Sequence, residues 1–236
     1  ASVVDSAWGV LAMKRRLQYG VLLLIALVPV AYYAHFFEGI HPGTVYFYTD
    51  GLPPLANPYL VRIWFFPIIA LLAVNFNFVH HQLHGPFIQT VVRTQTRGQL
   101  FGRLYITKIG HQMGALMGGL VVYLLCRIIS GYAVWWPNWA HMGLSLLAFL
   151  LLFSIQFVGD LYVEPLIVYI VLNVYVFVSV SLPAVDMNGV MGLVLFPNAL
   201  MACRVQHVGL YYVGLLVMAL LFILIGRYRF NRMDLL

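Results

Sequence analysis

Long apolar runs with very few charges are the feature that most constrains this chain. Hydrophobic residues fill 63% of the 236 positions and charged residues only 8%, whereas soluble domains carry about a quarter charged residues. A water-exposed surface needs more polar groups than this sequence supplies. Lipid removes that requirement, so the sequence predicts an all-α polytopic membrane protein.

Six segments are long enough, or nearly so, to cross a bilayer as helices. The hydrocarbon core is about 30 Å thick and a helix rises about 1.5 Å per residue, so a span needs about 20 residues. We expect one transmembrane domain over 1–236, with spans at 17–37, 59–80, 107–130, 141–159, 165–182 and 208–226. Residues 1–16 place apolar side chains on one face ahead of a basic cluster, which predicts an interfacial helix.

The basic residues predict the orientation of these spans. With six spans both termini lie on one side of the membrane, and that side also receives the segment between the second and third spans. Most of the 13 Lys and Arg residues fall there, namely Lys14, Arg15, Arg16, Arg93, Arg97, Arg103, Lys108, Arg227, Arg229 and Arg232. Cytoplasmic segments carry such an excess. We therefore expect a multi-pass protein of the inner (cytoplasmic) cell membrane, with both termini in the cytoplasm.

Two connections between spans have a pattern of their own. The cytoplasmic segment from about His80 to Lys108 is basic, and Phe87, Ile88 and Val91 share one helical face, which predicts an amphipathic element at the inner surface. The outer segment 181–207 is apolar enough in part to re-enter the membrane. Its backbone would then have to be paired within the protein.

The sequence offers no set of residues for nucleotide hydrolysis. It contains neither a GxxxxGK[ST] phosphate-binding loop nor a GxGxxG turn. No Ser/His/Asp or Cys/His set can be recognised, and Cys126 and Cys203 lack metal-binding spacing. The net charge is +6, but the basic residues are not gathered in one soluble domain, which argues against a nucleic-acid-binding protein. We expect a chain that is not itself an enzyme.

The eight histidines leave an alternative open. His80 and His84 are four residues apart and would share one helix face, a spacing compatible with a metal. Histidines from different spans can also ligate haem iron. The alternative hypothesis is a membrane redox subunit with ligands among His80, His84, His111, His141 and His207. Because amphipathic rings are common near span ends, we favour interfacial polar residues and expect no metal.

The remaining polar residues near the spans fall into two groups. Asp160 and Glu164 lie in the short segment between the fourth and fifth spans, where we expect a solvated turn or a contact with a cytoplasmic partner. The second group consists of amides within spans or at their ends, Asn75, Asn77, Gln156 and Asn173. They either bond between helices or line a translocation path.

The order of these features resembles the permease subunits of bacterial ABC transporters of the ABC-2 type. The stretch "LAMKRRLQYG" looks like their interfacial helix, and "FIQTVVRTQTRGQLFGRLYITKIG" resembles their coupling region between the second and third spans. The ending, "LFPNALM" followed by a last span and "GRYRFNRMDLL", is similar to their outer re-entrant segment, last helix and tail. One departure is that residues 87–108 contain no acidic residue, whereas many members carry one there.

The resemblance implies a non-catalytic transport subunit. Two copies of a cytoplasmic ATPase would hold ATP and Mg, this chain would need no cofactor, and a second permease chain, identical or related, would complete the path. The coupling contacts would come from Phe87, Ile88, Val91, Arg93, Arg97 and Arg103. The small size looks most like exporters of peptides or lipid-like molecules, including lantibiotic self-protection systems. A non-enzymatic membrane scaffold is a third hypothesis.

Overall fold

The described part of the chain is built from helices. The computed structural model describes residues 58–74, 76–84, 96–129, 131, 139–181, 190–200, 205 and 207–233. These residues contain no strand, so the expected helical fold is confirmed. The helix expected at 1–16, the span expected at 17–37 and the residues Asn75, Phe87, Ile88, Val91 and Arg93 lie outside them.

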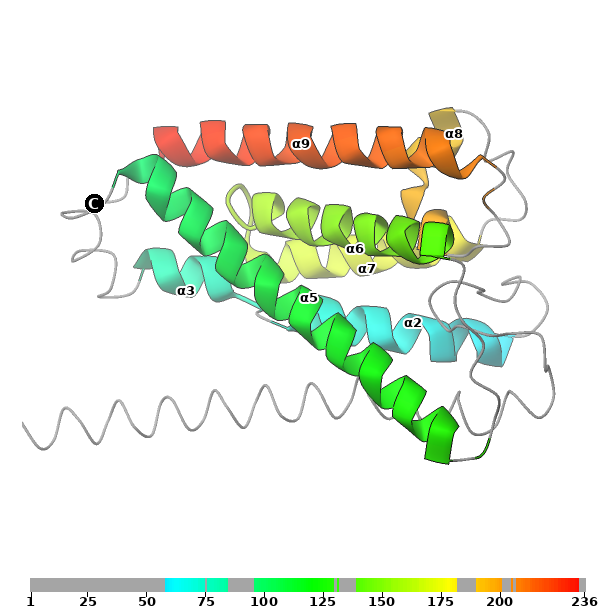
Figure 1. Ribbon diagram of the computed structural model, residues 1–236. Coiled ribbons are helices and arrows are strands. Elements are labelled where there is room, and N and C mark those ends of the chain that lie inside the picture. The colour runs from blue at the N-terminus through cyan, green and yellow to red at the C-terminus, as the bar shows by residue number, and fades with distance from the viewer. Residues whose placement is uncertain are drawn as a thin grey trace, which may run out of the picture.

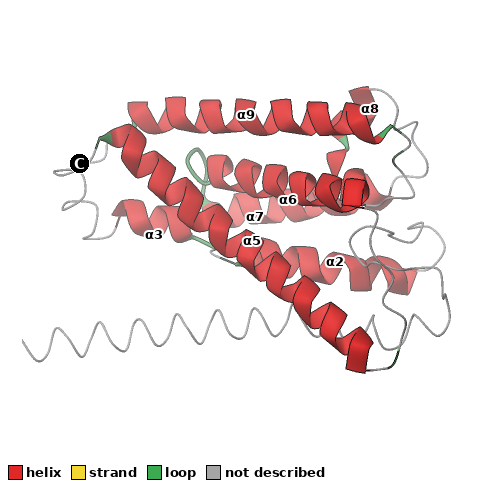
Figure 2. Ribbon diagram, in the orientation of Figure 1, coloured by secondary structure: helices red, strands yellow, loops and turns green. Residues whose placement is uncertain are grey.

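One helix lies at the centre of the bundle. The elements are α2 (Pro58–Ala73), α3 (Phe78–His84), α5 (Arg97–Ile129), α6 (Trp139–Gly159), α7 (Pro165–Ser181), α8 (Val190–Val194), the 3-10 helix η1 (Phe196–Leu200) and α9 (Val208–Arg232). α6 packs against α5, α7, η1 and α9 (Figures 1 and 2). Its side chains Leu151, Leu152 and Phe153 are completely buried in the main core.

Two helices of the described residues are long and apolar enough to cross a membrane. They are α6, with 21 residues, and α9, with 25 residues. Most of the apolar stretch of α6 is buried by other helices, whereas most of that of α9 faces outward. α7 is also apolar but has 17 residues. The lengths and compositions of α6 and α9 suit a membrane protein.

The continuous span expected at 59–80 is interrupted. α2 ends at Ala73 and α3 begins at Phe78, with Asn77 between them in the left-handed region at φ 61°. Asn tolerates this conformation better than most residues because its short side chain bonds locally. The apolar composition of 59–80 does not reveal the break, which depends on Asn77 and on bonds from other helices.

α5 starts ten residues before the span expected at 107–130. Thr96 and Gln99 form a capping box: the Thr96 N–H donates to Gln99 Oε1 over 3.1 Å, and the Gln99 N–H donates to Thr96 Oγ1 over 3.4 Å. This cap starts a helix of 33 residues, about 50 Å long. Arg97 and Arg103 therefore lie on the same continuous helix as the expected third span.

α6 and α7 form a tight hairpin near the boundaries expected for the fourth and fifth spans. α6 ends at Gly159 and α7 begins at Pro165. A Cβ at Gly159 would lie 2.7 Å from Val168 Cγ1, so a larger residue would push α7 away. α8 and η1 follow α7 in sequence, and η1 returns to pack against α6 and α7.

Candidate functional site

One end of the bundle gathers buried polar residues from several helices. α3, the first turns of α5, the α6–α7 turn and the last turns of α9 meet there, on the left of Figure 1, and we call this region the polar end. An aromatic cluster holds it together: Phe101 and Tyr105 of α5 contact Phe157 of α6, and Phe101 contacts Phe230 of α9. Their ring centroids lie 5.3 to 5.7 Å apart.

A buried ion pair joins α5 to the α6–α7 turn. Lys108 Nζ lies 2.5 Å from Asp160 Oδ2, and the two side chains are 0% and 1% exposed. Burial raises the pKa of the Asp160 carboxyl, and the charge of Lys108 opposes that rise. A pair removed from water in this way is costly to break, because either partner alone would be an uncompensated buried charge.

Two glutamine side chains near this ion pair bind each other and the carbonyl groups at the end of α2. Gln112 Nε2 donates to Gln156 Oε1 over 2.7 Å, and also lies 3.3 Å from the Leu71 carbonyl oxygen. Gln156 Nε2 donates to the Leu72 carbonyl oxygen over 2.8 Å. The last carbonyl groups of a helix lack partners within it. The two glutamines supply those partners where α2 stops.

The other two terminal carbonyl groups of α2 are satisfied by the backbone that follows. The Ala70 oxygen accepts from the Val74 N–H over 3.0 Å, and the Ala73 oxygen accepts from the Phe76 N–H over 2.9 Å. The interruption therefore leaves none of the carbonyl groups of residues 70–73 unpaired. A helix can break inside a membrane only under this condition.

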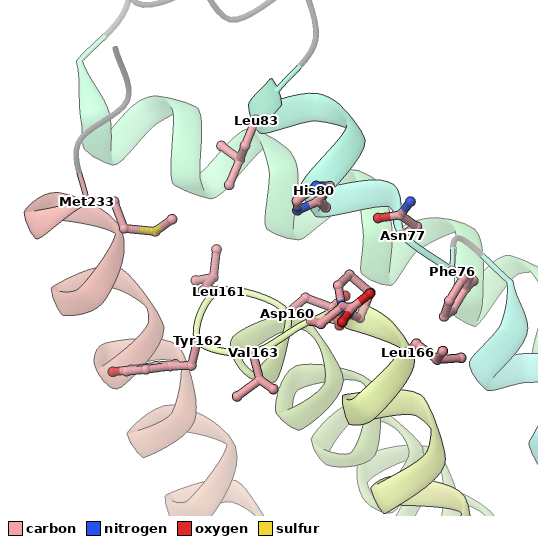
Figure 3. Close-up of a pocket in the computed structure, with 12 residues that line it drawn as sticks. Phe76, Asn77, His80, Leu83, Asp160, Leu161, Tyr162, Val163, Leu166 and Met233 are labelled. Carbon is pink, nitrogen blue, oxygen red and sulfur yellow. The ribbon is translucent and has the colours of Figure 1, made fainter.

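A pocket of about 640 Å³ opens beside Asp160. His80 and Asn77 lie on one side of it, the α6–α7 turn lies on the other, and Met233 reaches it from the end of α9 (Figure 3). Asp160 Oδ1 makes no hydrogen bond, although the carboxyl is buried. Glu164, which also lines the pocket, is exposed.

The structure changes the interpretation of one acidic residue. Asp160 was expected in a solvated turn or at a contact with a cytoplasmic partner; its side chain is buried and paired with Lys108, which lies three turns into α5. Glu164 has the exposed position expected of a turn residue. The pairing has a sequence signal, because Lys108 begins one expected span and Asp160 ends the next, antiparallel one. Charges at such depths pair with one another.

The two described arginines of the expected coupling set both lie near the start of α5. Arg97 Nη1 donates to the carbonyl oxygens of Asn231 and Met233 over 2.6 and 3.1 Å, and so ties the start of α5 to the end of α9. Arg103 lies two turns further along and is exposed. Arg97 therefore has a structural role that its basic character did not indicate.

The described amides proposed for a translocation path do not line one common cavity. Gln156 is buried between helices, as the bonding alternative expected, and Asn77 lines the pocket. Asn173 lies on α7 and donates to the Tyr169 carbonyl oxygen of its own helix over 2.8 Å. Gln112, which the sequence interpretation had not singled out, is the residue that joins Gln156 to α2.

The histidines of the redox alternative are dispersed. Among the described residues, no group of three His, Cys, Asp or Glu side chains is placed to hold a metal ion. His80 and His84 both lie on α3, whereas His111 lies on α5, His141 on α6 and His207 just before α9. His80, His111 and His207 are exposed.

Comparison with known proteins assigns a family to nearly the whole chain. Residues 21–236 match the family model described as "Protein of unknown function (DUF2705)". No curated protein and no solved structure matches the chain significantly. Because the family model covers nearly the whole sequence, the chain belongs to the DUF2705 family.

Proposed function

We propose that this chain is the transmembrane permease subunit of an ATP-driven exporter of the ABC-2 type. It has six spans in the inner (cytoplasmic) membrane, with both termini in the cytoplasm. A separate cytoplasmic subunit, present in two copies, hydrolyses ATP, and a second permease chain completes the path. The substrate is a peptide or another amphipathic, lipid-like molecule.

The outward faces of α7 and α9 support the membrane part of the proposal. Exposed large apolar residues continue along both helices, namely Leu166, Ile167, Ile170, Val171, Val174, Phe177 and Val178 on α7, and Leu210, Val213, Leu216, Val217, Leu220, Leu221, Leu224 and Ile225 on α9. Water-soluble monomers rarely expose an apolar area of this extent. Contact with lipid accounts for it.

The segment between α7 and α9 supports a re-entrant element of the kind that the ABC-2 resemblance implies. Asn198 of η1 is completely buried, and its Nδ2 donates to the carbonyl oxygens of Ser179 and Leu195 over 3.0 and 2.9 Å. The Asn198 side chain thereby donates hydrogen bonds to one carbonyl group near the end of α7 and to a second carbonyl group just after α8. Irregular backbone at membrane depth requires such internal bonding.

The observation that carries the proposal is the continuity of α5 with the core. One uninterrupted helix begins at Arg97, packs Leu100, Phe101 and Leu104 against the aromatic cluster, and crosses α6 before it ends at Ile129 (Figure 1). A force applied at its basic start is transmitted to α6 and α9, because close-packed interiors move between discrete arrangements and do not deform continuously. A subunit driven by an external motor requires such a connection.

Two experiments test the proposal. Purification of the chain from its native membrane is expected to bring a cytoplasmic ATPase with it, and isolation without any such subunit would contradict the proposal. In the complex, Arg103→Glu is expected to reduce the stimulation of ATP hydrolysis by substrate, whereas Arg103→Lys keeps it. Arg97 is not suited to this test, because replacing it also releases the end of α9.

A further inference from the structure

The pocket at the polar end has a combination of charge and apolar surface that the proposed function does not use. The described residues contain two carboxylate side chains, Asp160 and Glu164, and both line this pocket. No Lys or Arg is among its described lining residues. Much of the remaining lining is apolar, from Phe76, Leu83, Leu161, Val163, Leu166 and Met233.

One buried oxygen at this pocket lacks a partner. Asp160 Oδ2 binds Lys108, whereas Asp160 Oδ1 is buried without a hydrogen bond. A buried acceptor left without a donor costs about 1–3 kcal/mol, and more when it is charged. A ligand with N–H donors would remove that cost. Because Lys108 balances the charge of Asp160, the exposed carboxylate of Glu164, one turn away, supplies the negative charge at the same opening.

The chemistry of the lining selects the class of ligand. A divalent metal ion would need several oxygen or nitrogen ligands, and no group of three His, Cys, Asp or Glu side chains in the described residues is placed for one. A volume of about 640 Å³ suits a small organic molecule. An acidic, partly apolar pocket of this size matches a molecule with a cationic head and an apolar body.

We propose that this pocket binds an amphipathic organic cation, with its ammonium or guanidinium group between Asp160 and Glu164 and its apolar part against Leu161, Val163 and Leu166. Figure 3 shows these apolar side chains next to Asp160, on the α6–α7 turn and the start of α7. The residues named here all come from this chain. The proposal can therefore be tested on the purified chain, without an ATPase partner and without transport.

Binding of a fluorescent amine to the purified chain in neutral detergent micelles tests the proposal. The probe is dansylcadaverine, whose primary ammonium is separated from an apolar fluorophore, and its matched control is N-pentyl dansylamide, which lacks the amine. After subtraction of the signal from empty micelles, the amine is expected to bind more tightly than the neutral control. Equal affinities would overturn the proposal, and so would the absence of binding.

Three variants test whether the Glu164 carboxylate holds the cation and whether the ligand occupies this pocket. Glu164→Gln is expected to weaken amine binding about three- to tenfold and to leave binding of the neutral control unchanged. Asp186→Asn removes the same charge from the segment between α7 and α8 and is expected to change neither. Val163→Trp fills the pocket at a partly exposed position and is expected to block both ligands.

Two results with these variants would refute the site. If Glu164→Gln binds the amine as tightly as the wild-type chain does, the carboxylate does not hold the cation. If Val163→Trp binds the amine normally, the ligand lies elsewhere. Because no nucleotide or ATPase is present, either result leaves the proposed transport function untouched.

Discussion

Replacement of Lys108 by Met is expected to destabilise the chain strongly. The variant leaves Asp160 buried without its cation, since the two side chains are 0% and 1% exposed. Removing one partner of a buried pair costs about 3–5 kcal/mol. Without Lys108, the buried Asp160 carboxylate becomes neutral only by binding a proton. At pH 7 this step costs about 4 kcal/mol for a carboxyl of ordinary pKa about 3.9.

The same reasoning predicts a pH dependence with a definite sign. In Lys108→Met, burial holds the pKa of folded Asp160 above its unfolded value, so the folded form binds a proton that the unfolded form has lost. Stability therefore falls as pH rises above about 4, by about 1.4 kcal/mol per unit while the folded form stays protonated. The loss relative to the wild-type chain is expected to be smaller at pH 5 than at pH 7.

The assay is equilibrium unfolding in mixed micelles, and its control is the double variant Lys108→Met with Asp160→Leu. With both charges removed, the double variant is expected to recover most of the lost free energy, because an apolar pair of similar volume often replaces a buried ion pair without loss. The reasoning fails if Lys108→Met lies within about 1 kcal/mol of the wild-type chain, or if the double variant is as unstable as the sum of the single ones.

Three further predictions concern packing and backbone bonding. Gly226→Ala places a Cβ 2.8 Å from Val158 Cγ2 and is expected to lower the unfolding temperature, whereas Gly209→Ala, with open space around its Cβ, is expected to stabilise by up to about 1 kcal/mol. Asn198→Leu removes the side-chain donor to the buried Ser179 carbonyl oxygen, whereas the Leu195 oxygen keeps the Asn198 N–H, and is expected to cost about 1–3 kcal/mol, seen as faster hydrogen exchange near η1. Arg97→Gln is expected to speed proteolysis of the C-terminal end of α9, and an unchanged rate would contradict the role of Arg97 there.

The sequence predicted the helical character well because it depends on composition and length. The apolar runs at 141–159, 165–182 and 208–226 each fall mainly within one observed helix. Their ends follow from local signals, such as Pro165 at the start of α7. The basic end of α9 was likewise visible as a change from apolar to charged residues.

The interruption of α2 and the early start of α5 were not predicted from the sequence. The break depends on Gln112 and Gln156, which lie far from α2 in sequence and bind its terminal carbonyl groups. The start of α5 does have a local signal, since Thr96 and Gln99 have the spacing of a capping box.

The polar end was predicted in part. The sequence places Asp160 and Glu164 together in the short segment between two spans, but the burial of Asp160 depends on its ion pair with Lys108, which lies on another helix. Buried pairs between helices cannot be read from the charge pattern of one segment. The pocket depends on the meeting of α3, the α6–α7 turn and Met233, which the sequence does not place together.

The central claim is that the end of the bundle where α5 begins and α9 ends faces the cytosol. Cysteine labelling at the two ends of α9 tests it, after Cys126 and Cys203 have been replaced by Ala. His207→Cys places a thiol at an exposed position just before the start of α9, and Arg232→Cys places one at an exposed position at its end. With a membrane-impermeant maleimide, we predict that His207→Cys is labelled in intact cells and Arg232→Cys only after permeabilisation. Labelling of Arg232→Cys in intact cells would contradict the claim.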